Sequence, residues 1–265
     1  MTTLQDRLTQ LLPVWQNDVK SFLNEHGDDV ISKVTLSQAY GGMRGVRALV
    51  CETSLVEPDT GLVIRGIPVK KLVDRLPEEV LWLLLTGEFP DEHQLQWLQS
   101  DLRKRARVPD YVWTVLEAMP RDSHPMCMLN TAILCMGRES VFHRHYDEGL
   151  TKEHYWGETL DDALNLIARL PAVAAGIYRL RFGKGPRILS SPKLDWGADF
   201  AYMLGIDDPD GSFAKLMRLY LVLHSDHESG NVSANAAATV NSALSDLYYA
   251  LSAGLNGLAG PLHGL

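Results

Sequence analysis

Cysteine is scarce in this chain and does not occur in pairing patterns. Only three of the 265 residues are cysteine, Cys51, Cys127 and Cys135, and no CxxC pair is present. An odd and widely spaced set is typical of free thiols in a reducing compartment, and it argues against a disulfide framework.

Long apolar runs and targeting features are also missing. No apolar run approaches the roughly 20 residues that cross a bilayer. Residues 1–6 lack the basic start and apolar core of a secretion signal, and the Arg- and Ser-rich character of a transit peptide. We therefore expect a protein without membrane contacts in the cytoplasm, with the mitochondrial matrix as the alternative.

An excess of positive charge is absent as well. The formal net charge is −8, so general binding to nucleic acid is not expected. Hydrophobic residues make up 46% of the chain and charged residues 22%, an ordinary balance for a globular protein. A phosphate-bearing ligand would have to be bound by a local group of arginine and lysine side chains.

Helical periodicity dominates what is present, and one short region departs from it. Two β-branched runs, Leu49–Leu55 and Leu62–Ile67, flank turn-forming residues and predict a hairpin. The expected fold is therefore mainly α with one small β-hairpin near residues 49–67, and the Gly-, Pro- and Ser-rich stretch Phe182–Lys193 is predicted to be a loop. Apolar residues recur at three- and four-residue steps, as in amphipathic helices, in the segments 4–23, 78–86, 92–107, 111–119, 128–136, 160–181, 196–204 and 212–225.

Polar residues gather at the end of an apolar run in the last third of the chain. Leu219–Leu223 leads directly into His224-Ser-Asp-His-Glu-Ser-Gly-Asn231. Asn231 can cap a following helix, which we predict over Val232–Leu255. The many small side chains of this helix would let another helix approach closely, within the chain or from a second subunit.

Histidines are the side chains best suited to proton transfer near neutral pH. His263 lies in a loop with glycines at 257, 260 and 264, which can bring backbone close to a ligand. Its composition alone leaves a catalytic and a structural role both open. His124 precedes a proline at a plausible helix start, and polar surroundings predict surface positions for His26, His93, His143, His145 and His154.

Several segments closely resemble the citrate synthase family. In the last third these are His224–Glu228, Asn231–Ala234, Ser242–Asp246 and Asn256–Leu265. Earlier segments agree in the same order, namely Tyr40–Gly45, Glu52–Ser54, Arg65–Gly66, Trp82–Leu84, Thr86–Gly87, His124–Met126, Tyr155–Trp156 and Lys193–Trp196. The chain is most similar to the type of citrate synthase shared by mitochondria and some bacteria.

The resemblance implies an enzyme that condenses acetyl-CoA with oxaloacetate and hydrolyses the citryl thioester. It implies no separate cofactor and no metal, since coenzyme A enters as part of a substrate. His263 matches the catalytic histidine that hydrogen-bonds the thioester carbonyl, and Ser233 matches the residue that holds its far ring nitrogen.

The resemblance also implies binding residues for both substrates. His227 matches an oxaloacetate ligand, with His224 and Asn231 forming the wall around it. Arg44 matches a position that contacts the phosphates of coenzyme A, and Lys152 stands where relatives have an arginine from the partner subunit. Two further departures are Ser229, where the family usually has glycine, and Asn235, where the most similar relatives have histidine.

On this resemblance, residues 1–265 form the N-terminal part of the family's large domain. In the family the chain continues with the carboxylate base, further substrate-binding arginines and the small domain. We therefore expect this chain alone to be inactive and its own C-terminal continuation to be a partner. We also expect a homodimer that uses the helix 232–255, where Ala236, Ala243 and Ala250 fall seven residues apart, with packing inside the chain as the alternative.

Three other readings remain open from the sequence. 2-Methylcitrate synthase would use propionyl-CoA with the same residues. A metal-dependent hydrolase would use His224, His227 and Glu228, although the usual HExxH spacing is absent. The chain could also be a non-catalytic fragment of the same ancestry.

Overall fold

The computed structural model describes residues 2–264, and most of them lie in α-helices. A small antiparallel sheet with the order β1-β2-β3 contains Ser54–Glu57, Gly61–Ile64 and Ile67–Pro68. The helices are α1 Leu4–His26, α2 Leu36–Tyr40, α3 Pro77–Thr86, α4 Glu92–Arg105, α5 Asp110–Ala118, α6 Pro125–Met136, α7 Val141–Asp147, α8 Tyr155–Arg181, α9 Trp196–Leu204, α10 Ser212–Leu223, α11 Val232–Asn241 and α12 Leu247–Leu258. Short 3₁₀ turns occur at Val69–Lys71, Gly137–Glu139 and Lys152–His154.

The predicted mainly α fold with one small hairpin is confirmed, with two corrections to the hairpin. Its first strand begins at Ser54 rather than Leu49, and Ile67–Pro68 adds a third strand. The predicted loop over Phe182–Lys193 is also confirmed, because no helix or strand forms between α8 and α9.

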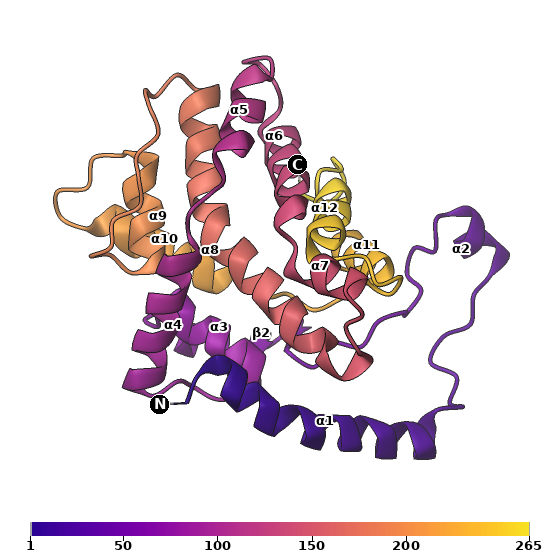
Figure 1. Ribbon diagram of the computed structural model, residues 1–265. Helices are drawn as coiled ribbons and strands as arrows, with labels where there is room; N and C mark the ends of the chain where they lie inside the picture. The colour runs from indigo at the N-terminus through magenta and orange to yellow at the C-terminus, as the bar shows by residue number, and fades with distance from the viewer. Residues whose placement is uncertain (1, 265) are drawn as a thin grey trace.

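Helix α8 runs through the centre of the molecule, with α9 and α10 on one side and α6 and α12 on the other (Figure 1). One core cluster joins α5, α6, α8 and α12, and a second joins α1, α3, α4 and α8. A third cluster packs the sheet against α3 and α10. Residues 27–50, which include α2, are mostly exposed and extend away from this core (Figure 1).

The segment Lys152–Arg181 is long and apolar enough to cross a bilayer by length and composition, contrary to the expectation from the sequence. Half of its apolar window is buried inside the protein, and Asp162 is fully buried within α8. We interpret α8 as a core helix, since core helices meet the same length and composition criteria.

The predicted single helix over Val232–Leu255 is wrong. The chain turns at Ser242–Ser245, where Leu244 has a φ of 61°, and Asp246 starts α12 by accepting hydrogen bonds from the backbone N–H of Tyr248 and Tyr249. Helices α11 and α12 fold back against each other. Gly254 and Gly257 of α12 pack against Ser233 and Ala237 of α11 inside the chain. Ala236, Ala243 and Ala250 fall in α11, in the turn and in α12, so they do not share one helical face.

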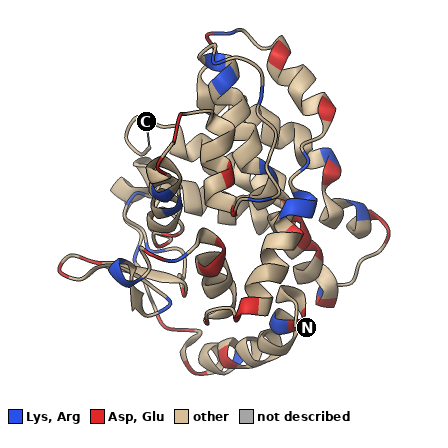
Figure 2. Cartoon of the chain, turned by 90° about the vertical axis from the view of Figure 1, so that its left-hand side faces the viewer, with Lys and Arg blue, Asp and Glu red and all other residues tan. Residues whose placement is uncertain are grey.

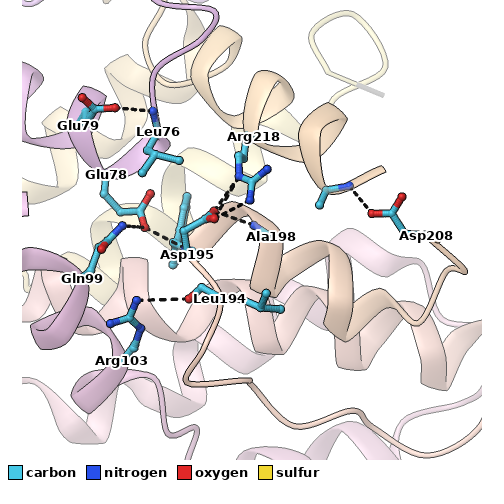
Figure 3. A network of polar contacts seen from close by, with 12 residues as sticks. Leu76, Glu78, Glu79, Gln99, Arg103, Leu194, Asp195, Ala198, Asp208 and Arg218 are labelled. Carbon is cyan, nitrogen blue, oxygen red and sulfur yellow. Dashed lines mark hydrogen bonds and ion pairs between the residues drawn. The ribbon is translucent and has the colours of Figure 1, made fainter. Parts of the chain in front are cut away.

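A buried polar network fixes α3, α4, α9 and α10 to one another (Figure 3). The carboxylate of Glu78, which is 1% exposed, accepts hydrogen bonds from Gln99 Nε2 at 3.2 Å and from the backbone N–H of Trp196 at 2.9 Å. Asp195 caps α9 and binds Arg218 of α10, with 2.6 Å between Arg218 Nη2 and Asp195 Oδ2. Glu78 and Asp195 are each held by partners from two helices, and Arg218 is held by Asp195.

Charges of both signs are distributed over the helices. Figure 2 shows lysine and arginine positions interspersed with aspartate and glutamate positions. This agrees with a modest net charge of −8 that is spread over the chain. Recognition of an anion would therefore depend on individual arginine and lysine side chains.

Candidate active site

The first α-helical turn of α11 and the loop after α12 bring three polar side chains together. Asn231 caps α11, with its Oδ1 accepting the backbone N–H of Ala234 at 2.9 Å. Ser233 Oγ lies 2.6 Å from the same oxygen and 2.9 Å from His263 Nε2. Residues 30 positions apart in the sequence are thus in direct contact.

Two glycines of α12 make this contact possible. A Cβ atom at Gly257 would lie 3.3 Å from both Cα and N of Ser233. A Cβ atom at Gly254 would lie 3.2 Å from the carbonyl oxygen of Ser233. Both neighbours are backbone atoms that cannot rotate away, so glycine at these positions lets α12 approach the start of α11 closely.

The loop after α12 presents the imidazole to solvent. The backbone N–H of His263 donates to Gly260 O at 2.9 Å, which closes a tight turn after the helix. Pro261, Leu262, His263 and Gly264 are all exposed. Since Nε2 faces Ser233, the Nδ1 edge of the ring is the one available to a ligand.

Buried polar residues lie in helix α12 and in the neighbouring helix α8. Tyr248 of α12 is fully buried, and burial raises the pKa of its hydroxyl above the usual range. Asp162 of α8, also fully buried, accepts hydrogen bonds from Ser140 Oγ at 2.7 Å and the backbone N–H of Val141 at 2.7 Å. Burial raises the pKa of Asp162 above its ordinary value despite these hydrogen bonds. The hydrogen bonds of Asp162 join α7 to α8, and α12 packs against α8.

The segment between α10 and α11 is attached to the hairpin. The carboxylate of Asp226 accepts from Thr53 Oγ1, and the carboxylate of Glu228 accepts from the backbone N–H of Val56. The backbone N–H of Glu228, at a φ of 56°, donates to Ser54 Oγ at 2.7 Å. Sequence reasoning missed these anchors, because nothing local links residues more than 170 positions apart.

The anchored segment carries the two predicted oxaloacetate histidines, and both are exposed. His224 ends α10, where its Nδ1 lies 2.8 Å from Tyr220 O and its ring stacks on Tyr220 with centroids 4.2 Å apart. The backbone N–H of His227 donates to Asp226 Oδ1 at 2.8 Å, and within residues 2–264 its ring makes no hydrogen bond to Ser233 or His263. The structure therefore brings Asn231, Ser233 and His263 into one hydrogen-bonded network. His224 and His227 precede Asn231 in the sequence and are not part of this network.

The arrangement expected for a metal-dependent hydrolase is not assembled. Within residues 2–264, no group of three His, Cys, Asp or Glu side chains could hold a metal ion. Glu228 is directed to the hairpin and His224 to Tyr220, so neither completes a site with His227.

The two predicted coenzyme A positions lie on exposed backbone away from this network. Arg44 lies in the turn after α2, between Gly42 and Gly45, which have φ values of 70° and 75°. Lys152 begins the 3₁₀ turn before α8 and is exposed. Neither contacts Ser233 or His263.

The other histidines agree with their predicted places. His124 is the N-cap of α6, and its Nδ1 accepts the backbone N–H of Met126 at 3.2 Å. The five predicted surface histidines are exposed, apart from the half-buried His145. Exposure therefore does not distinguish His263, which is recognised by its contact with Ser233.

Comparisons with known proteins are consistent and cover nearly the whole chain. The family described as "Citrate synthase, C-terminal domain" matches residues 42–265. The mitochondrial citrate synthase of Saccharomyces cerevisiae is 43% identical over 99% of this chain and 56% of its own length. Citrate synthase 4, mitochondrial, of Arabidopsis thaliana is also 43% identical, over 99% of this chain and 57% of its own. The chain thus spans about half the length of these curated relatives.

Solved structures show the same fold. The citrate synthase of Pyrobaculum aerophilum superposes with a TM-score of 0.78 and 28% identity, over 89% of this chain and 60% of that chain. The Thermoplasma acidophilum enzyme, solved with carboxymethyl coenzyme A and oxaloacetate, has a TM-score of 0.73 and 24% identity, over 84% of this chain and 57% of that chain. At that identity the second likeness is evidence for the fold alone.

Proposed function

This chain belongs to the citrate synthase family, and on that premise we propose that it supplies the histidine side of an active site that joins acetyl-CoA to oxaloacetate. The observation that carries the proposal is the contact between Ser233 Oγ and His263 Nε2 at 2.9 Å. It leaves the other ring nitrogen of His263 directed outward, at an exposed loop where a thioester can approach. The activity is proposed for the protein that carries these 265 residues, since they span about half of the relatives.

In this proposal His263 stabilises charge on the thioester oxygen. Removing a proton from the acetyl methyl group moves negative charge onto that oxygen, and a hydrogen-bond donor already in position lowers the barrier. The resulting carbon nucleophile attacks the ketone carbon of oxaloacetate, and hydrolysis of the citryl thioester releases citrate and coenzyme A. No metal or bound cofactor takes part in these steps.

Binding is assigned to residues that flank the network. His227, with His224 and Asn231, would contact oxaloacetate, because the segment that carries them is fixed to the hairpin and ends at the cap of α11. Arg44 and Lys152 would bind the phosphates of coenzyme A. The guanidinium of Arg44 suits a phosphate better than the point charge of Lys152, so Arg44 is expected to contribute more.

We further propose a homodimer, on a surface that combines α6 with the α12 part of the predicted segment 232–255 and does not depend on its small residues. Gly254 and Gly257 of α12 and Ala237 of α11 are occupied by the contact between the two helices. The adjacent helices α6 and α12 expose Leu134 and Tyr249, with 44% and 58% of their surfaces accessible. Sedimentation should show a dimer that Leu134→Arg converts to monomer, and a monomeric parent protein would contradict this surface.

Both curated relatives carry the word mitochondrial in their names, which favours the mitochondrial matrix over the cytoplasm as the compartment to examine first. Fractionation of the source cells with a detected tag would decide between the two. Recovery in the cytoplasmic fraction would reverse this preference.

The function is tested by following thioester loss and coenzyme A release with acetyl-CoA and oxaloacetate. In the full-length protein that carries these 265 residues, we expect turnover that depends on both substrates, and a reduction in kcat of about 10²–10⁴-fold in His263→Gln. Wild-type kcat in that variant would contradict the role of His263. Replacing acetyl-CoA by propionyl-CoA in the same assay tests the alternative, 2-methylcitrate synthesis, which higher kcat/KM for propionyl-CoA would favour.

A further inference from the structure

The hydrogen bonds around Ser233 determine where each hydrogen lies. Asn231 Oδ1 accepts the backbone N–H of Ala234 at 2.9 Å. An amide NH₂ group cannot accept a hydrogen bond, so the atom that faces this N–H must be the oxygen of Asn231. The orientation of the Asn231 amide is therefore fixed by the helix it caps.

Ser233 has one hydroxyl hydrogen and two neighbours that compete for it. Its Oγ lies 2.6 Å from Asn231 Oδ1, which can only accept, and 2.9 Å from His263 Nε2, which can accept or donate. If the hydrogen pointed to His263, two oxygen acceptors would face each other at 2.6 Å with no hydrogen between them. The hydrogen of Ser233 therefore goes to Asn231.

The histidine must then donate to Ser233. The oxygen of Ser233 presents a lone pair toward the ring, so Nε2 of His263 carries the hydrogen. A neutral imidazole has a single N–H, which leaves Nδ1 without one. The ring nitrogen available to a ligand is thus an acceptor in this arrangement, whereas the proposed chemistry needs a donor there.

We propose that Asn231 is a positioning residue that sets the tautomer of His263 through Ser233. In the substrate-free site, Asn231 keeps the hydrogen of Ser233 and holds His263 in its Nε2–H form. Donation from Nδ1 requires the Ser233 hydroxyl to turn from Asn231 to Nε2, which in turn requires the 2.6 Å distance between Ser233 Oγ and Asn231 Oδ1 to lengthen. The ring then releases the Nε2 proton to solvent and takes up a solvent proton at Nδ1, with no change in net charge.

The catalytic meaning of this switch rests on the proposed function, but the tautomer assignment does not. In this assignment the amide oxygen of Asn231 has two roles. It caps α11, and it competes for the hydroxyl that faces the catalytic histidine. A role limited to capping would leave the tautomer of His263 independent of residue 231.

The test is ¹⁵N NMR of the histidine-labelled protein at a pH where the rings are neutral, with His263 assigned from the signals missing in His263→Gln. The wild type is expected to carry its hydrogen on Nε2. Asn231→Gly removes the competing oxygen and, since glycine is a tolerated N-cap, weakens the cap only slightly. This variant should raise the share of the Nδ1–H tautomer.

Asn231→Asp is the matched control, because its carboxylate keeps both the cap and the acceptor for Ser233. It should retain the Nε2–H form. An Nδ1–H wild type, or no rise of that form in Asn231→Gly, would overturn the proposal. The measurement needs no turnover, so an inactive protein with the expected tautomers would refute the proposed function and leave this inference standing.

Discussion

Two polar networks in this molecule use similar groups in opposite ways. In the network of Glu78, Asp195 and Arg218, the side chain of Glu78 is 1% exposed and both acidic side chains bind partners from two helices. In the network of Asn231, Ser233 and His263, three side chains share few hydrogens at an exposed loop. The first arrangement leaves little freedom and stabilises the fold, whereas the second leaves one histidine nitrogen available for chemistry.

The largest expected effect comes from breaking the exposed network at its centre. Within residues 2–264, Ser233 is the only side chain that hydrogen-bonds the ring of His263, so in Ser233→Ala the imidazole loses its fixed orientation. A displacement of about 1 Å can reduce rate by 10²-fold, and we expect a loss of kcat of that size. The unfolding midpoint should change by less than about 2 °C, since Ser233 caps no helix. Steady-state kinetics and thermal unfolding check both statements.

Breaking the buried network should show the reverse pattern. Asp195→Ala removes the cap of α9 and the partner of Arg218. A lost cap destabilises by about 1 kcal/mol, and hydrogen bonds to charged groups contribute somewhat more. Because Arg218 is one-third exposed, with a side-chain accessibility of 33%, we expect a total loss of about 2 kcal/mol. Urea unfolding measures it, and Asp195→Asn, which retains the cap, should lose less.

The stability lost in Asp195→Ala should depend on pH in one direction. Burial opposes ionisation of Asp195, but Arg218 and the backbone N–H of Ala198 outweigh it and hold its pKa below the ordinary value of 3.8. The ion pair therefore adds stability above that value, and this stability disappears as pH falls through the lower folded-state pKa. The stability gap between wild type and Asp195→Ala should shrink in acid, and a gap that grew there would contradict the assignment.

The two helices that join at the exposed network allow a finer test. Gly257→Ala would place a methyl group 3.3 Å from two backbone atoms of Ser233 and push α11 away from α12. We expect roughly a tenfold loss of kcat from the shift of Ser233 relative to His263, below the effect of a full 1 Å displacement. Gly211→Ala, at a glycine with φ of 73° and no atom within 4 Å, is the control for strain without a clash. Equal kcat in both variants would show that the helix contact does not position Ser233.

The smallest expected effect is a change in the pH profile of stability. Burial raises the pKa of Glu78 above its ordinary value of 4.5, so the folded protein favours the neutral carboxyl. Stability from this group is fully present below pH 4.5 and decreases as pH rises through the folded-state pKa. Glu78→Gln removes this ionisation, so the unfolding midpoint of the variant should rise relative to that of the wild type as pH increases. An unchanged difference from pH 4 to pH 8 would argue that Glu78 is charged in the fold.

The sequence predicted the parts of the fold that depend on local pattern. The stripe of 196–204 gave α9 at its observed bounds, and the stripe of 111–119 gave α5 within one residue. The sequence did not predict the break between α11 and α12. Small residues continue through Ser242–Ser245, and periodicity alone does not show the positive φ at Leu244.

The candidate site was predicted from family resemblance and not from spacing. The contact between Ser233 and His263 forms because α11 and α12 fold back on each other. The pattern of small residues had predicted one continuous helix there instead. The anchors of Asp226 and Glu228 on the hairpin depend on long-range packing for the same reason. Local pattern predicts elements, but the pairing of distant elements brings this site together.

The contrast between the two networks is tested most directly by measuring kcat and the unfolding midpoint on the same preparations of His263→Gln and Asp195→Ala. We predict that His263→Gln loses at least about 10²-fold in kcat with an unchanged midpoint, and that Asp195→Ala loses stability while the folded protein keeps its kcat. If His263→Gln retained wild-type kcat, or if both variants lost the two quantities together, the division of roles would be wrong.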